Sequence, residues 1–240
     1  MNTQTQTKAL DGRLLSTIRW SLSRCVTFVL DLLYPLACAG CGKAGEGVWC
    51  AACDARVSRL IPSEQQKQFP LVSPWQGFPL RVASGARYAP PLREAVHAFK
   101  YDGTPGLAAP LAPLLLDAWR NAAFNADIIV PVPLHARRRR ERGYNQSELL
   151  ARGLAAACGV PVDTRLLTRV RYTDQQALLK GAARRQNVQG AFVADARANG
   201  KLIVLVDDVL TSGATLTECA SILLNAGAGS VCAVTLARAE

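Results

Sequence analysis

The chain has 240 residues, of which 50% are hydrophobic and 19% are charged. This length and balance predict one well-buried globular domain with a smaller unit, and they exclude a wholly disordered chain. The formal net charge is +10, and the segment from Pro131 to Gly190 carries twelve Lys and Arg against four Asp and Glu. Such a local basic excess favours an anionic partner, such as a phosphate ester, a pyrophosphate or nucleic acid.

Residues 1–36 are predicted to form a disordered leader and an amphipathic helix. The leader is rich in Gln and Thr, and apolar residues recur at helical spacing across 14–36. Three charged residues interrupt this helix, so neither a secretory signal nor a transmembrane segment is predicted, and we expect a cytoplasmic protein. We expect this helix to pack on its own domain or on a partner, with a peripheral membrane helix as the alternative.

A compact four-cysteine unit is predicted over residues 37–57. Cys38 and Cys41 form one CxxC pair, and Cys50 and Cys53 form a second. Four thiolates match a structural, tetrahedral zinc site, and the glycines around the pairs permit tight turns. Two redox-active CxxC pairs, or four unrelated buried cysteines, are the alternatives to zinc.

The rest of the chain is predicted to be a linker followed by an α/β domain. Residues 58–81 contain several prolines and little periodicity, which is typical of a linker. Over 82–240, buried strands alternate with helices, and this order predicts a parallel sheet flanked by helices. The expected strands are 127–133, 201–206 and 230–236, and the expected helices are 91–101, 107–123, 147–158 and 215–226.

A ligand loop is predicted where the strand 201–206 meets the next helix. Asp207 and Asp208 follow the strand, at the edge where open α/β sheets place ligands. The helix is then opened by Thr211, Ser212, Gly213, Ala214 and Thr215. Free amides at a helix start favour a phosphate, whereas the carboxylates suit ribose hydroxyls or Mg²⁺. The alternative is an ordinary strand–turn–helix with Thr as N-cap. The glycine spacing matches neither a Walker nor a Rossmann loop.

The paired aspartates and the Thr211–Thr215 run resemble the phosphoribosyl-pyrophosphate motif of type I phosphoribosyltransferases. The two CxxC pairs and several further motifs narrow the resemblance to the ComF (competence protein F)/GntX family, over about residues 30–238. These motifs are Phe99-Lys100-Tyr101, Pro131–His135, Arg142–Gln146 and the stretch Arg169–Phe192. The resemblance implies a type I phosphoribosyltransferase-like parallel sheet with a small N-terminal zinc unit.

The resemblance also implies a ligand and the residues that bind it. The ligand is phosphoribosyl pyrophosphate or a related ribose 5-phosphate ester with Mg²⁺, and the activity is phosphoribosyl transfer to an unidentified acceptor. Asp207 and Asp208 are the expected catalytic residues. The residues expected around the pyrophosphate and in a flexible hood loop are Lys100, Arg142, Asn145, Gln146, Arg171, Gln176 and Arg184.

A second function, of a different class, is implied by the same resemblance. It is that of a non-catalytic accessory protein of DNA uptake and natural transformation, which meets single-stranded DNA, a helicase-like partner and other competence proteins. For the run Arg137–Arg140, ligand contact and a solvated polyanion-binding patch remain equal alternatives. Neither His97 nor His135 is assigned a catalytic role.

Overall fold

The computed structural model describes residues 36–71, 75, 79–173 and 186–239. The predicted leader and amphipathic helix lie outside this range, as do Gln176 and Arg184. Within the part of the chain that is described, no helix is both long and apolar enough to cross a membrane.

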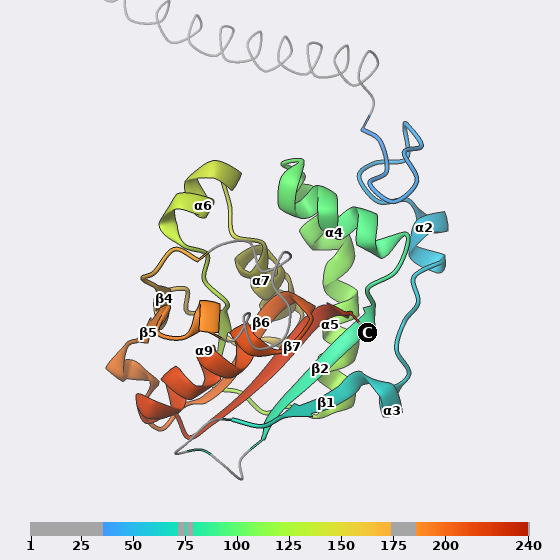
Figure 1. The fold of residues 1–240 in the computed structure, drawn as a ribbon. Coiled ribbons are helices and arrows are strands. Elements are labelled where there is room, and N and C mark those ends of the chain that lie inside the picture. Colours follow the sequence, from blue (N-terminus) through green and yellow to red (C-terminus); the bar gives the residue numbers. More distant parts are fainter. Residues whose placement is uncertain (1–35, 72–74, 76–78, 174–185, 240) are drawn as a thin grey trace, which may run out of the picture.

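A five-stranded sheet in the order β1-β2-β7-β6-β3 forms the centre of the molecule (Figure 1). Its strands are β1 Gln66–Phe69, β2 Leu80–Arg87, β3 Ile128–Pro131, β6 Leu202–Leu210 and β7 Ser230–Arg238. The β1 strand pairs antiparallel with β2, whereas all other neighbours are parallel. The mostly parallel α/β fold expected from the sequence is therefore confirmed.

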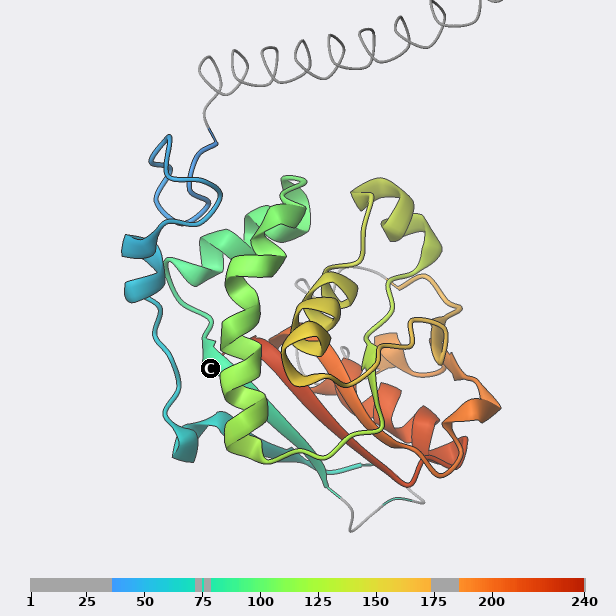
Figure 2. The ribbon, with the colours of Figure 1, turned by 180° about the vertical axis from the view of Figure 1, so that it is seen from behind.

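Helices cover both faces of the sheet. Alternate residues of β6 divide between two hydrophobic clusters, because successive side chains of a strand point to opposite faces. Val204 packs with α5 (Ala108–Ala122) and α7 (Gln146–Cys158), and Leu205 packs with α9 (Ala214–Asn225). The reverse view shows α5 and α7 together on one face (Figure 2). The remaining elements are α2 Ala51–Ala55, α3 Pro62–Gln65, α4 Leu92–Tyr101, η1 Pro105–Leu107, α6 Ala136–Arg142, β4 Leu167–Arg169, β5 Phe192–Ala194 and η3 Ala196–Ala198.

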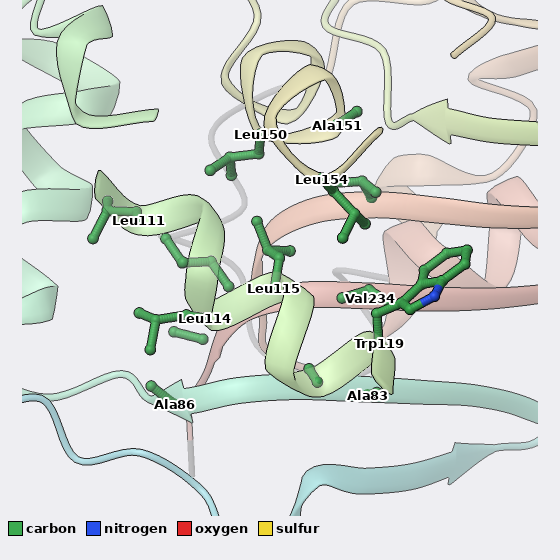
Figure 3. Packing of buried hydrophobic residues seen from close by; sticks show 14 of the residues in the cluster. Ala83, Ala86, Leu111, Leu114, Leu115, Trp119, Leu150, Ala151, Leu154 and Val234 are labelled. Atoms are coloured by element: carbon green, nitrogen blue, oxygen red, sulfur yellow. The ribbon is translucent and has the colours of Figure 1, made fainter. Parts of the chain in front are cut away.

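The larger core lies between α5, α7 and the sheet. Leu111, Leu115 and Trp119 recur at helical spacing on α5 and belong to this core. Leu115 points toward Leu154 of α7 (Figure 3). Close approach of helix and sheet depends on Gly85 in β2. A Cβ atom at that position would lie 2.3 Å from a backbone oxygen of α5, so only glycine fits.

Several segments differ from the sequence prediction, and β2, β4, β5 and α6 were not predicted at all. Two further differences concern the segments around Asp207 and before β2. The strand expected over 201–206 continues to Leu210, because β7 pairs with it as far as Arg238, so Asp207 and Asp208 lie inside β6 and not after it. Residues 58–81, expected to be a linker, contain α3 and β1. The polar composition of β1 suits an edge strand but hides it in the sequence. We propose the division into 1–36, 37–57, 58–81 and 82–240, with β1 completing the sheet of the last part.

Candidate functional site

A cavity of about 300 Å³ opens at the carboxyl ends of β3 and β6. The loop after β3, the end of α4 and the starts of α7 and α9 surround it. Parallel sheets bind ligands at this edge because loops and helix starts converge there. The charged side chains that line the cavity are Lys100, Arg138, Arg142, Arg169, Asp207 and Asp208.

The two aspartates of β6 have different partners. Asp207 Oδ1 accepts hydrogen bonds from Ser147 Oγ and from the backbone N–H of Asp208, both at 2.9 Å. Asp208 Oδ1 lies 2.6 Å from Lys100 Nζ in an ion pair that is largely shielded from solvent. Burial, reinforced by the neighbouring Asp208 carboxylate, raises the pKa of Asp207 to about 7, although Lys100 opposes this shift.

The loop before α9 forms part of the cavity wall. Gly213 is the N-cap of α9, has a φ of 76°, and leaves the helix without a side-chain cap. Of the predicted phosphate-binding residues, Thr211, Gly213, Ala214 and Thr215 line the cavity. Ser212 does not; it is exposed, and its Oγ accepts a long hydrogen bond of 3.5 Å from the Ala214 N–H. A helix start whose N-cap residue makes no side-chain hydrogen bond is suited to an anion.

Three arginines form the basic wall of the cavity. Arg142 stacks on Tyr101, with 5.3 Å between the guanidinium carbon and the ring centroid. Arg138 donates to the backbone oxygen of Thr173 at 3.2 Å. Arg169 also donates to Thr173, and its Nε has no hydrogen-bond partner among the atoms of the described segments. Burial lowers the pKa values of Arg142 and Arg169; this desolvation favours an anion beside them.

Other residues predicted for the site support it from outside the cavity. Asn145 caps α7 by accepting from the Ser147 N–H at 3.1 Å, and it donates to the Val132 oxygen at 3.0 Å. Asn145 thereby fixes the start of α7 against the loop after β3. Arg171 donates to the backbone oxygens of Asn187 and Gln189, at 3.1 and 2.6 Å, and does not line the cavity.

Gln146, by contrast, lines the cavity and also donates to the Phe99 oxygen at 3.4 Å. Several polar residues of the cavity, among them Ser147, Arg138 and Arg169, were not assigned to the site from the sequence. In the sequence, Ser147 looks like any residue in the first turn of a helix. Arg138 lies within the run Arg137–Arg140, for which ligand contact and a solvated polyanion-binding patch are equal alternatives. Arg169 can be recognised as a site residue only if Leu167–Arg169 is predicted to be a strand. Its charged side chain would then be partly buried, and a buried cation requires a partner.

The four cysteines of the N-terminal unit form a second candidate site. The Sγ atoms of Cys38, Cys41, Cys50 and Cys53 all lie within 4.8 Å of one another. Four sulfurs bound to zinc at about 2.3 Å in a tetrahedron lie about 3.8 Å apart, and the Cys41 and Cys50 sulfurs are separated by 3.8 Å. The residues therefore fit a zinc ion. Burial raises the pKa of Cys38, but backbone N–H donors, chiefly Cys50, outweigh it and bring the value down to about 6, whereas burial and the neighbouring sulfurs raise the pKa of Cys53.

The four-cysteine unit packs against the start of α4. A Cβ atom on Gly40 would lie 2.8 Å from the Trp49 ring, 2.9 Å from Cys53 Sγ and 3.0 Å from Pro91 Cβ. Trp49 in turn packs on the larger core and donates its indole N–H to Asp54 at 3.1 Å. The same α4 helix carries Lys100 at its other end, so it connects the unit to the cavity.

Comparison with known proteins places this architecture in a class. The phosphoribosyl transferase domain family matches residues 143–240, which include β6, the loop after it and α9. The matched domain and the parallel sheet define a phosphoribosyltransferase-like protein. The chain is also similar to glutamine phosphoribosylpyrophosphate amidotransferase from B. subtilis, with 26% identity and a TM-score of 0.39, over 54% of this chain and 26% of that one.

Related proteins with established names identify the family to which the chain belongs. The chain is 41% identical over 163 residues to DNA utilization protein YhgH of Salmonella typhimurium, covering 66% of this chain and 70% of that protein. It is 34% identical over 160 residues to competence protein F of Haemophilus influenzae, covering 63% and 70%. The chain belongs to the ComF family, which confirms the resemblance seen in the sequence.

Proposed function

We propose that the cavity binds a phosphoribosyl compound, such as phosphoribosyl pyrophosphate, by its 5-phosphate at the start of α9. The observation that supports this most directly is that a helix start without a side-chain cap faces the same cavity as two aspartates and four cations. The Gly213 region offers backbone N–H groups and the positive end of the α9 dipole to a phosphate. The carboxylates of Asp207 and Asp208 are suited to accept from ribose hydroxyls.

The pyrophosphate end of such a ligand would lie toward the arginines. Arg142 and Arg138 approach the cavity from α6, near the loop that follows β3. Guanidinium groups match phosphate oxygens in a bidentate geometry. The same groups would stabilise charge on a departing pyrophosphate, so the geometry supports phosphoribosyl transfer, with little acid–base chemistry required of the protein.

Calorimetric thermal unfolding with phosphoribosyl pyrophosphate and Mg²⁺ tests this proposal. We expect the ligand to raise the Tm of the wild type and to leave the double variant Asp207→Asn/Asp208→Asn unshifted. Asp163→Asn/Asp195→Asn is the matched control, because both aspartates pair with Arg197 outside the cavity. A wild-type Tm that stays constant at millimolar ligand would exclude the proposal.

We propose zinc as the structural metal of the four-cysteine unit. Cys38, Cys41, Cys50 and Cys53 would be its ligands, and four protein sulfurs leave no open position for catalysis. Bound zinc would supply cross-linking energy to a unit too small for a substantial core.

A second candidate function is contact with single-stranded DNA through α6, in the accessory role that the names of the relatives suggest. The α6 helix has no buried residue. Arg137 stacks on the exposed ring of Tyr172 at 4.9 Å, and His135 meets the same ring edge-on at 5.4 Å. Arginines interleaved with exposed aromatic rings can hold a phosphate backbone and stack bases.

Fluorescence anisotropy with a labelled oligothymidine at several salt concentrations tests this second function. Replacing Arg137 and Arg140 by Ala should weaken binding, and the slope of log K against log salt should fall by about 0.7 for each phosphate that the variant no longer neutralises. Arg93→Ala/Arg120→Ala serves as the control, because it removes the same charge from exposed positions on other helices. An equal weakening of binding in both variants would contradict a specific role for α6.

A further inference from the structure

Lys100 holds the position beside Asp208 that a divalent cation would need. Its Nζ lies 2.6 Å from Asp208 Oδ1, and the two side chains are only 22% and 11% exposed. The fully buried Phe99 anchors the end of α4, and its backbone oxygen accepts from Tyr144 Oη at 2.6 Å. Lys100 is therefore built into the cavity wall by its helix, unlike a surface lysine that is free to move away.

The carboxylates leave little room for magnesium. Mg²⁺ requires oxygen ligands at about 2.0–2.1 Å in octahedral geometry, and an ammonium bonded to the same carboxylate would repel it. One oxygen of Asp208 is occupied by Lys100, and Oδ1 of Asp207 already accepts from Ser147 and from the Asp208 N–H. The donor set thus disagrees with the magnesium ion that the family resemblance implies.

The charge of the cavity favours an anion even without a metal ion. Four cationic side chains and two carboxylates line it, which gives a formal excess of 4 − 2 = +2. Arg169 adds a buried Nε that has no partner within the described residues, and a buried donor of this kind favours a ligand acceptor. These groups can offset part of the negative charge of a phosphate and a pyrophosphate, a task that a divalent cation would otherwise perform.

We propose that Lys100 replaces the divalent metal at this site, so that the cavity binds a phosphoribosyl pyrophosphate anion directly and without magnesium. This inference rests on the proposed binding function. It adds that binding of the ligand requires no divalent cation. Lys100 acts as a resident cation. Its ammonium group holds the Asp208 carboxylate in place and presents positive charge to the phosphate groups of the ligand.

Isothermal titration with phosphoribosyl pyrophosphate in EDTA and in Mg²⁺ tests the inference. For the wild type we expect a Kd in EDTA within about threefold of the value in Mg²⁺. Lys100→Met keeps most of the length of the side chain and removes its charge, so the affinity of this variant in EDTA should fall at least ~10-fold. Added Mg²⁺ should restore part of that affinity, because the freed carboxylate can then accept a metal. Lys100→Arg, which keeps the charge, should remain independent of Mg²⁺.

The outcomes separate this inference from the function on which it rests. Wild-type binding only in Mg²⁺ would overturn the resident-cation inference and leave the binding proposal intact. Equal affinity of Lys100→Met and the wild type in EDTA would also overturn it. Absence of binding in both buffers would refute the binding proposal itself and this inference with it. Circular dichroism and the Tm of each variant establish that the chain is folded.

Discussion

Gly213 in the loop before α9 lies directly against the ring of Phe69 in the edge strand β1. A Cβ atom on Gly213 would lie 2.6 Å from Phe69 Cδ1 and 2.7 Å from Cε1. The φ of Gly213 is also 76°, a value that other residues adopt at a cost. The proposed phosphate loop is therefore shaped by a segment that the sequence predicts to be a linker.

This contact predicts that Gly213→Ala destabilises the fold by about 2 kcal/mol, from left-handed backbone strain and from overpacking against the ring. Urea unfolding measures the change. In a Phe69→Ala background the clash is absent, so the same substitution should cost at least ~1 kcal/mol less. An identical cost in both backgrounds would show that Phe69 does not restrict the loop.

Zinc removal should weaken the N-terminal unit. We expect one zinc per chain by elemental analysis of the purified protein, and we expect Cys41→Ser to lower that content together with the Tm. Cys158→Ser is the control, because Cys158 is a half-buried thiol far from the cluster in sequence and packs on the main core. Zinc content that is equal in the two variants would contradict the proposed ligand set.

The packing of the unit on α4 gives a third prediction. Gly40→Ala places a methyl group against Trp49 and Pro91, so the free energy of unfolding should fall by about 1–3 kcal/mol in zinc-containing buffer. In the control Gly106→Ala, the added Cβ lies 3.7 Å from Val48, an ordinary contact, and the change should stay within about 0.5 kcal/mol. A reversed order of the two costs would be inconsistent with a tight interface at Gly40.

Stability should depend on pH through Asp207, whose pKa of about 7 lies above its ordinary value of 3.8 because of burial and the Asp208 carboxylate. Between these values the folded state binds more protons than the unfolded state, so the free energy of unfolding falls as pH rises from about 4 to 7. Asp207→Asn removes this charge and keeps an oxygen for Ser147.

We therefore expect Asp207→Asn to be more stable than the wild type by at least ~1 kcal/mol at pH 8, with a smaller difference at pH 5. Chemical unfolding of both proteins at the two pH values provides the measurement. A difference that is constant with pH, or that grows toward pH 5, would show that Asp207 is not the titrating group.

The α/β pattern can be read from the sequence because its strands are continuous apolar runs and its helices have periodic apolar faces. The strand β1 cannot, since Gln66-Lys67-Gln68 becomes a strand only through pairing with β2. The sequence places the end of β6 four residues early because Asp207 and Asp208 interrupt the apolar run, whereas pairing with β7 continues to Leu210.

The candidate site can be predicted from the sequence where its residues are neighbours along the chain. Asp207, Asp208 and the loop before α9 are adjacent in sequence, so their shared edge of the sheet follows from one strand–helix junction. Lys100 is expected near the phosphates, but its pairing with Asp208 depends on how α4 packs across the sheet. Arg169 reaches the cavity through the β4–β5 pair, a long-range arrangement without a local signal.

Phosphorus NMR of phosphoribosyl pyrophosphate titrated with the protein tests the central claim most directly, because the 5-phosphate and the two pyrophosphate phosphorus atoms give separate signals. We predict that the wild type shifts or broadens the 5-phosphate signal, and that Gly213→Ala, which distorts the loop before α9, reduces this effect. A 5-phosphate signal that stays sharp and unshifted at saturating protein, whatever the pyrophosphate signals do, would contradict binding of the ribose 5-phosphate end at α9.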